Sequence, residues 1–170
     1  KILVAQVLGQ VFMKRAFEDP FGQMETVLKT HVLGGAVQAA IVDVHCEATS
    51  EKMAMGHWLD GRASLVVGTH THVPTADECV LPGGTAFQAD VGMTGPYDSI
   101  LGRRVDRVME TTLTANPTQF EVASKDVRLG GAIVDVDAAT GRATRIERLC
   151  VTEAELPELD KLAEAKEPGK

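Results

Sequence analysis

The sequence has 170 residues, enough for one domain with a substantial buried core, and its formal net charge is −7 at pH 7. This negative balance excludes general electrostatic binding to duplex nucleic acid or to an anionic membrane, because both require clustered Lys and Arg. Three cysteines without a Cys-x-x-Cys spacing exclude a disulfide framework and a thiolate zinc site, and they favour a cytoplasmic protein.

The first part of the chain alternates apolar, strand-like runs with helical patterns. Buried strands are predicted at residues 1–8, 39–45 and 64–67. Helices are predicted at residues 21–33 and 50–61. This alternation indicates an α/β fold built from β-α-β units, whose crossovers are right-handed in nearly all proteins.

After residue 75 the pattern becomes typical of antiparallel strands. A hairpin is predicted for residues 78–81 and 85–89 around Pro82-Gly83-Gly84, followed by an irregular loop at 90–98. A helix is predicted at 103–115, and closing strands are predicted at 119–123, 127–136 and 143–151. Residues 152–170 are charged and poor in core residues, so we expect a solvated helical or frayed tail.

His70 and His72 directly follow the third predicted strand. In an extended segment side chains alternate between faces, so both imidazoles are expected to point the same way. Open α/β sheets bind ligands outside the carboxyl ends of their strands, and neutral imidazole is the commonest metal-ligating side chain. The two histidines are therefore candidate ligands that could hold one metal ion between them. The alternative is two loop histidines with solvent or backbone partners.

Asp43, His45 and Glu47 form a second candidate at the end of the second predicted strand. A period of two puts all three on one face, although an ordinary strand end emerging into water would look the same. Parallel strands on either side of one helix end at the same edge of a sheet. His45 is therefore expected to converge with His70 and His72.

The loop at residues 90–98 is a third candidate. Its glycines could bring backbone N–H groups close to a phosphate, and Thr94 and Tyr97 add hydroxyls. The alternative is a plain turn, which is what most glycine-rich loops are.

Four segments taken together resemble a known family, the bacterial branch of calcineurin-like metallophosphoesterases with 2′,3′-cyclic-nucleotide 2′-phosphodiesterase activity. The segments are residues 42–52, 60–63, 67–77 and 90–102. They stand in the family's order and spacing, and the resemblance runs from about Lys1 to Val151.

The resemblance implies a layered α/β/β/α sandwich, of which residues 1–151 would be the C-terminal part, and two metal ions, iron or manganese. His45 and His70 would bind one ion and His72 the other, and the implied reaction is hydrolysis by a hydroxide activated between ions roughly 3.5–4 Å apart. Asp43 and Glu47 would orient the imidazoles. The resemblance places the following residues beside a small phosphoester substrate such as a cyclic nucleotide: Thr94, Tyr97 and Asp98.

Family members carry further ligands ahead of the matched region: an Asp, a Glu-Asn pair and an Asn-His pair. This sequence does not contain them, so we expect the site to be incomplete in this chain. We also expect a homo-oligomer, since apolar surface left by the missing part could drive association. One alternative is a non-catalytic metal-binding fragment or pseudo-enzyme module. Another is an amidohydrolase, whose barrel of about 250 residues disagrees with the predicted hairpins.

Overall fold

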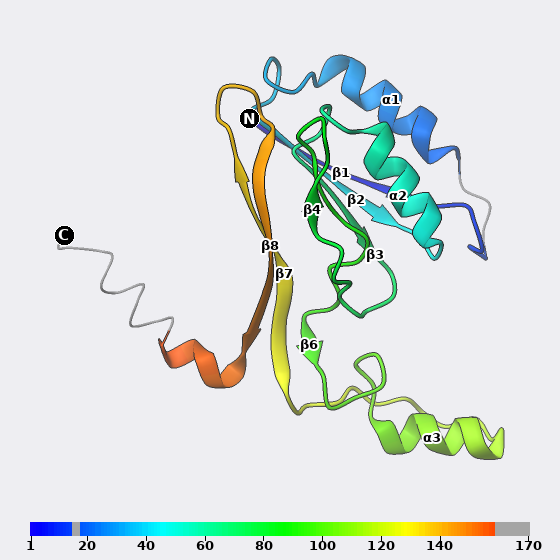
Figure 1. The fold of residues 1–170 in the computed structure, drawn as a ribbon. Helices are drawn as coiled ribbons and strands as arrows, with labels where there is room; N and C mark the ends of the chain where they lie inside the picture. Colours follow the sequence, from blue (N-terminus) through cyan, green and yellow to red (C-terminus); the bar gives the residue numbers. More distant parts are fainter. Residues whose placement is uncertain (15–17, 159–170) are drawn as a thin grey trace. The chain divides into compact units, whose positions relative to one another are not determined.

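A computed structural model describes residues 1–14 and 18–158 (Figure 1). The chain divides into two units. The first comprises Lys1–Gly92 with Ala132–Arg148, and the second comprises Met93–Gly131 with Leu149–Lys170. A helix able to cross a lipid bilayer is not found in the part of the chain that the structure describes.

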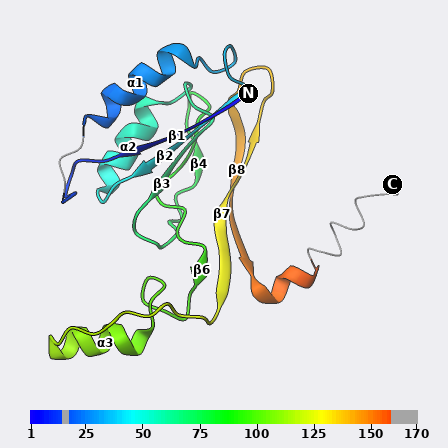
Figure 2. The ribbon, with the colours of Figure 1, turned by 180° about the vertical axis from the view of Figure 1, so that it is seen from behind.

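The first unit is built on a five-stranded sheet in the order β1-β2-β3-β5-β4. Its strands are β1 (Ile2–Leu8), β2 (Ala39–His45), β3 (Leu65–Thr69), β4 (Cys79–Val80) and β5 (Ala86–Gln88). Helix α1 (Pro20–Thr30) joins β1 to β2, and helix α2 (Thr49–Trp58) joins β2 to β3. The two crossovers run in the same direction, so both helices cover the same face of the sheet (Figures 1 and 2).

The core lies between that face and the two helices. Alternate β2 residues, Val42 and Val44, are fully buried, and they belong to one apolar cluster with Met24 of α1 and Met55 of α2. Helix α1 begins where its sequence indicates, because the Asp19 carboxylate accepts the N–H groups of the first turn. This packing fixes the ends of β2 and β3, which carry the candidate histidines.

The predicted α/β architecture is confirmed, with one correction to the sheet. The hairpin of β4 and β5 is antiparallel as predicted, but β5 also pairs in parallel with β3. The parallel sheet therefore continues one strand further than the sequence pattern indicated. All three residues of β5 are buried, including Gln88, and such a strand shows no alternation that would reveal its parallel neighbour.

The second unit contains β6 (Gly95–Pro96) and α3 (Val105–Thr114). The long strands β7 (Val127–Val136) and β8 (Ala143–Thr152) contribute to both units, and a three-stranded sheet has the order β6-β7-β8. The predicted strand at 119–123 is wrong. Within this segment Val122 alone pairs, in an isolated antiparallel bridge with Arg103 just before α3, and the segment does not form a strand. In the predicted tail, Glu153–Glu155 form a short 3₁₀ turn, and residues 159–170 lie outside the described part.

Candidate functional site

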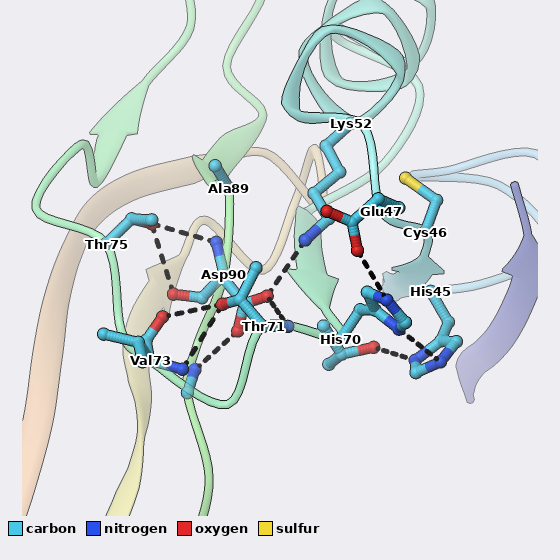
Figure 3. A network of polar contacts seen from close by, with 12 residues as sticks. His45, Cys46, Glu47, Lys52, His70, Thr71, Val73, Thr75, Ala89 and Asp90 are labelled. Carbon is cyan, nitrogen blue, oxygen red and sulfur yellow. Dashed lines mark hydrogen bonds and ion pairs between the residues drawn. The ribbon is translucent and has the colours of Figure 1, made fainter. Parts of the chain in front are cut away.

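The candidate site lies where β2 and β3 end. The two strands are parallel, with His45 in register with Thr69, so both finish at the same edge of the sheet. His45 is the last residue of β2, and His70 follows the last residue of β3. The predicted convergence of His45 and His70 is therefore confirmed, and Figure 3 shows their rings side by side.

The two imidazoles face each other through one nitrogen each. His70 Nδ1 lies 3.4 Å from His45 Nε2, and the ring planes are at 86°. The remaining nitrogens have polar partners: His45 Nδ1 lies 2.9 Å from Thr69 Oγ1, and His70 Nε2 lies 2.8 Å from a Glu47 carboxylate oxygen (Figure 3). Both rings are thus held from their outer sides.

These outer contacts set where the ring protons lie. The Thr69 hydroxyl donates to Asp43 over 2.8 Å, so it accepts the proton of His45 Nδ1. The Glu47 carboxylate accepts the proton of His70 Nε2. In the neutral rings, the two facing nitrogens then both present lone pairs, which repel unless a proton or a metal ion lies between them.

The separation of the facing nitrogens fits one shared metal ion. Two nitrogens each about 2.0–2.1 Å from a tetrahedral ion lie about 3.3–3.4 Å apart. The distance between His70 Nδ1 and His45 Nε2 is 3.4 Å. Asp43, through Thr69, and Glu47 occupy the outer positions predicted for orienting carboxylates, and that role stays a prediction.

A complete ligand set is not assembled within residues 1–14 and 18–158, because no group of three or more His, Cys, Asp or Glu side chains there is placed to hold a metal ion. Cys46 adjoins His45, but its side chain is fully buried in the apolar core cluster, and burial raises the pKa of its thiol to about 12. The imidazole pair therefore provides two ligands, fewer than the usual four.

The segment that carries His70 and His72 is not extended, so the expectation that strand alternation points both imidazoles the same way is wrong. Strand β3 ends at Thr69, and both histidines have positive φ angles, 123° for His70 and 67° for His72. Strand alternation does not extend into such a turn, and His72 is exposed. A non-glycine residue in this region costs about 1–3 kcal/mol and persists only where surrounding contacts hold it. The metal-binding role of His72 stays a prediction.

A buried ion pair, which the sequence analysis missed, lies beside this turn. Lys52 Nζ is 2.9 Å from Asp90 Oδ2, and their side chains are 2% and 1% exposed. Asp90 also accepts the N–H groups of Thr71 and Gly92, each over 2.9 Å (Figure 3). Burial favours the neutral carboxyl, but these hydrogen bonds outweigh it and lower the pKa of Asp90. One signal in the sequence was a lysine in the first turn of a helix that faces the core.

Gly68 of β3 allows this close packing. A Cβ atom at Gly68 would lie 1.8 Å from the Ala89 carbonyl oxygen and 2.6 Å from Lys52 Cδ. The carbonyl belongs to the backbone and has little freedom to move. Gly68→Ala is therefore expected to lower the free energy of unfolding by about 3 kcal/mol, the upper end for an overpacked core. Urea unfolding followed by circular dichroism measures the change.

Gly131→Ala is the matched control, because a Cβ there meets nothing within 4 Å. It is expected to change the free energy of unfolding by less than about 0.5 kcal/mol, as most surface substitutions do. Equal stability of the two variants would show that the backbone at Gly68 yields easily.

The predicted substrate-binding residues belong to the second unit, and their contacts are described within it. The Thr94 hydroxyl exchanges hydrogen bonds with the backbone of Gly130, and the Tyr97 hydroxyl donates to the Met93 carbonyl. Asp98 lines a cavity of about 380 Å³ together with Arg104 and Lys125, among others. Both hydroxyls thus brace the loop, and substrate binding by these three residues stays a prediction.

Comparisons with known proteins agree on one family. Residues 1–149 match the model of a family described as YmdB-like protein. Over 153 residues the chain is 41% identical to a 2′,3′-cyclic-nucleotide 2′-phosphodiesterase of Bacillus subtilis (strain 168), covering 90% of this chain and 57% of that protein.

Two solved structures share the fold. A hypothetical protein from Thermus thermophilus has a TM-score of 0.80 and 42% identity, covering 89% of this chain and 57% of that one. A novel phosphatase from Mycoplasma pneumoniae has a TM-score of 0.77 and 30% identity, covering 88% of this chain and 52% of that one. The chain thus spans little more than half the length of these relatives.

Proposed function

The chain belongs to the family of YmdB-like proteins, and from this membership and the facing imidazoles we propose that it carries part of a metal-dependent phosphodiesterase site. The observation that carries the proposal is the 3.4 Å approach of His45 Nε2 and His70 Nδ1, each ring held from outside by a hydrogen-bond acceptor. Two imidazole nitrogens face each other in this way when a proton or a metal ion lies between them, and the 3.4 Å separation also fits a shared metal ion.

His45 and His70 would hold one ion, and His72 would contribute to a second. We propose iron or manganese, as in the calcineurin-like metallophosphoesterases that the sequence resembles. When bound, such ions supply positive charge that stabilises the phosphoryl oxygens during hydrolysis. The chain's own contribution is orientation: Asp43, through Thr69, fixes the tautomer of His45, and Glu47 fixes that of His70.

We propose a small phosphoester as the substrate, with a 2′,3′-cyclic nucleotide as the first candidate. The name of the Bacillus subtilis relative supports that choice. The chain has a net charge of −7, so an anionic substrate requires a local positive centre, which bound cations would provide. We also propose a cytoplasmic homo-oligomer: Cys46, Cys79 and Cys150 are free thiols, and Ile2 and Val4 of β1 are largely exposed.

A second candidate is a non-catalytic metal-binding fragment or pseudo-enzyme module. It is favoured for this chain alone by the two-ligand set, since the described ranges bring no third His, Cys, Asp or Glu into one metal-holding group with His45 and His70. The two candidates differ in turnover and agree in metal binding.

The test uses the protein produced from its natural gene. Its hydrolysis of 2′,3′-cyclic AMP is measured with manganese or iron added, and is measured again after a chelator has removed the metal. We expect hydrolysis that chelation abolishes and that His70→Ala lowers by at least about 100-fold, as loss of a metal ligand predicts. Metal binding without turnover would favour the non-catalytic module. Turnover that chelation leaves unchanged would contradict the proposal.

A further inference from the structure

The turn that carries His70 depends on a contact from another segment. His70 and His72 both have positive φ angles, and Thr71 lies between them. The Thr71 N–H donates to Asp90 Oδ2 over 2.9 Å, from the segment that follows β5. A strained turn persists only where its surroundings hold it, so this carboxylate is well placed to keep the turn in shape.

Asp90 is itself held from several sides. Its backbone N–H donates to the Thr75 hydroxyl over 2.9 Å, and its carbonyl accepts the N–H of Thr75 and the amide of Gln88, each over 3.0 Å. Its carboxylate is 1% exposed and accepts the ammonium group of Lys52. A group fixed in this way has no freedom to follow a shifting turn, so it sets the position of Thr71.

Lys52 links this turn to the other histidine. It lies in the first turn of α2, the helix that begins shortly after His45 at the end of β2. The chain from Lys52 through Asp90 to Thr71 therefore connects the segment after His45 with the segment after His70 (Figure 3). It bridges the two sequence regions whose imidazoles must face each other.

We propose that Lys52 and Asp90 are positioning residues, which hold the turn at residues 70–72 so that His70 Nδ1 faces His45 Nε2. The contacts of Lys52, Asp90 and Thr71 support the positioning of the turn. The role of that positioning in metal binding rests on the proposed function. Neither side chain reaches the imidazoles through a hydrogen bond that the structure gives; both act through the backbone of Thr71.

Asp60 offers a matched control on the opposite edge of the same sheet. Its carboxylate also accepts two backbone N–H groups, those of Gly83 over 2.7 Å and Thr85 over 3.2 Å. It lies before β3, at the amino end of the strand, away from the histidines. Asp60→Asn therefore weakens a carboxylate brace of the same kind without touching the turn at 70–72.

The experiment compares Asp90→Asn and Asp60→Asn by two readouts on the purified chain. Amide hydrogen exchange, measured by NMR, reports how firmly Thr71 is held, and visible absorption during Co²⁺ titration reports metal affinity. For Asp90→Asn we expect Thr71 exchange to rise at least tenfold and Co²⁺ affinity to fall about 10- to 100-fold, the range for residues that orient metal ligands. Asp60→Asn should raise exchange at Gly83 and leave Thr71 and Co²⁺ affinity within about twofold.

Unchanged Thr71 exchange in Asp90→Asn, or an equal rise in Asp60→Asn, overturns the positioning role. If Asp90→Asn does not fold, Lys52→Met takes its place, because it removes the ammonium group that fixes the Asp90 carboxylate and leaves the Thr71 N–H its acceptor. Thr71 exchange is then expected to rise and Co²⁺ affinity to fall by less than in Asp90→Asn, and no change in Thr71 exchange overturns the positioning role. Absence of Co²⁺ binding by the unsubstituted chain would contradict the proposed function. The exchange rates then decide the positioning role by themselves.

Discussion

Lys52→Met is expected to lower the free energy of unfolding by about 3 kcal/mol, the lower end of the range for breaking a buried ion pair. The substitution leaves the Asp90 carboxylate 1% exposed and without its counter-ion. The N–H groups of Thr71 and Gly92 still donate to Asp90, which limits the loss. Urea unfolding of the purified chain, followed by circular dichroism, measures the effect.

Arg62→Met is the control for this prediction. Arg62 pairs with Glu25 over 2.7 Å, but both side chains are 37% exposed. Water screens such a pair, so its loss should cost no more than about 1 kcal/mol. If Lys52→Met costs no more than Arg62→Met, the buried pair does not hold the segments together as we infer.

Replacement of His45 or His70 by alanine is expected to weaken metal binding by at least about 100-fold. Each substitution removes one of the two facing nitrogens and leaves the other as a single, non-chelating ligand. Either variant should keep its fold, because both side chains are only partly buried at the end of a strand. Titration calorimetry with Mn²⁺, together with a circular dichroism spectrum of each variant, tests both statements.

His57→Ala is the matched control for the histidine substitutions. His57 is exposed in the last turn of α2, whereas Lys52 lies in the first turn. Its replacement should leave metal affinity unchanged. Equal losses in His45→Ala and His57→Ala would show that the ion binds imidazoles unselectively, and the pair at the sheet edge would lose its assigned role.

Much of this arrangement could be predicted from the sequence, because it follows from strand order. Apolar runs separated by helical patterns predicted β1, β2 and β3, and parallel strands end together. The meeting of His45 and His70 is a direct consequence, since each stands at or just after the end of its strand. Glu47 contacts His70 for the same reason, because it lies two residues after the end of β2.

The rest depended on backbone geometry that periodicity does not encode. The turn at residues 70–72 leaves the extended conformation, so alternation could not place His72. The Lys52–Asp90 pair joins residues 38 positions apart, and no local pattern links them. Gly68 was the accessible signal: a glycine inside a buried strand often marks close approach of another backbone, here that of Ala89.

The most direct test of the account follows the imidazole nitrogens of the ¹⁵N-labelled chain by NMR during titration with Zn²⁺. Zinc serves as a diamagnetic substitute for iron or manganese. The account predicts that His45 shifts at Nε2 and His70 shifts at Nδ1, together, at about one equivalent of zinc per chain. Shifts confined to the other histidines, or none at all, would contradict the assignment of this pair as metal ligands.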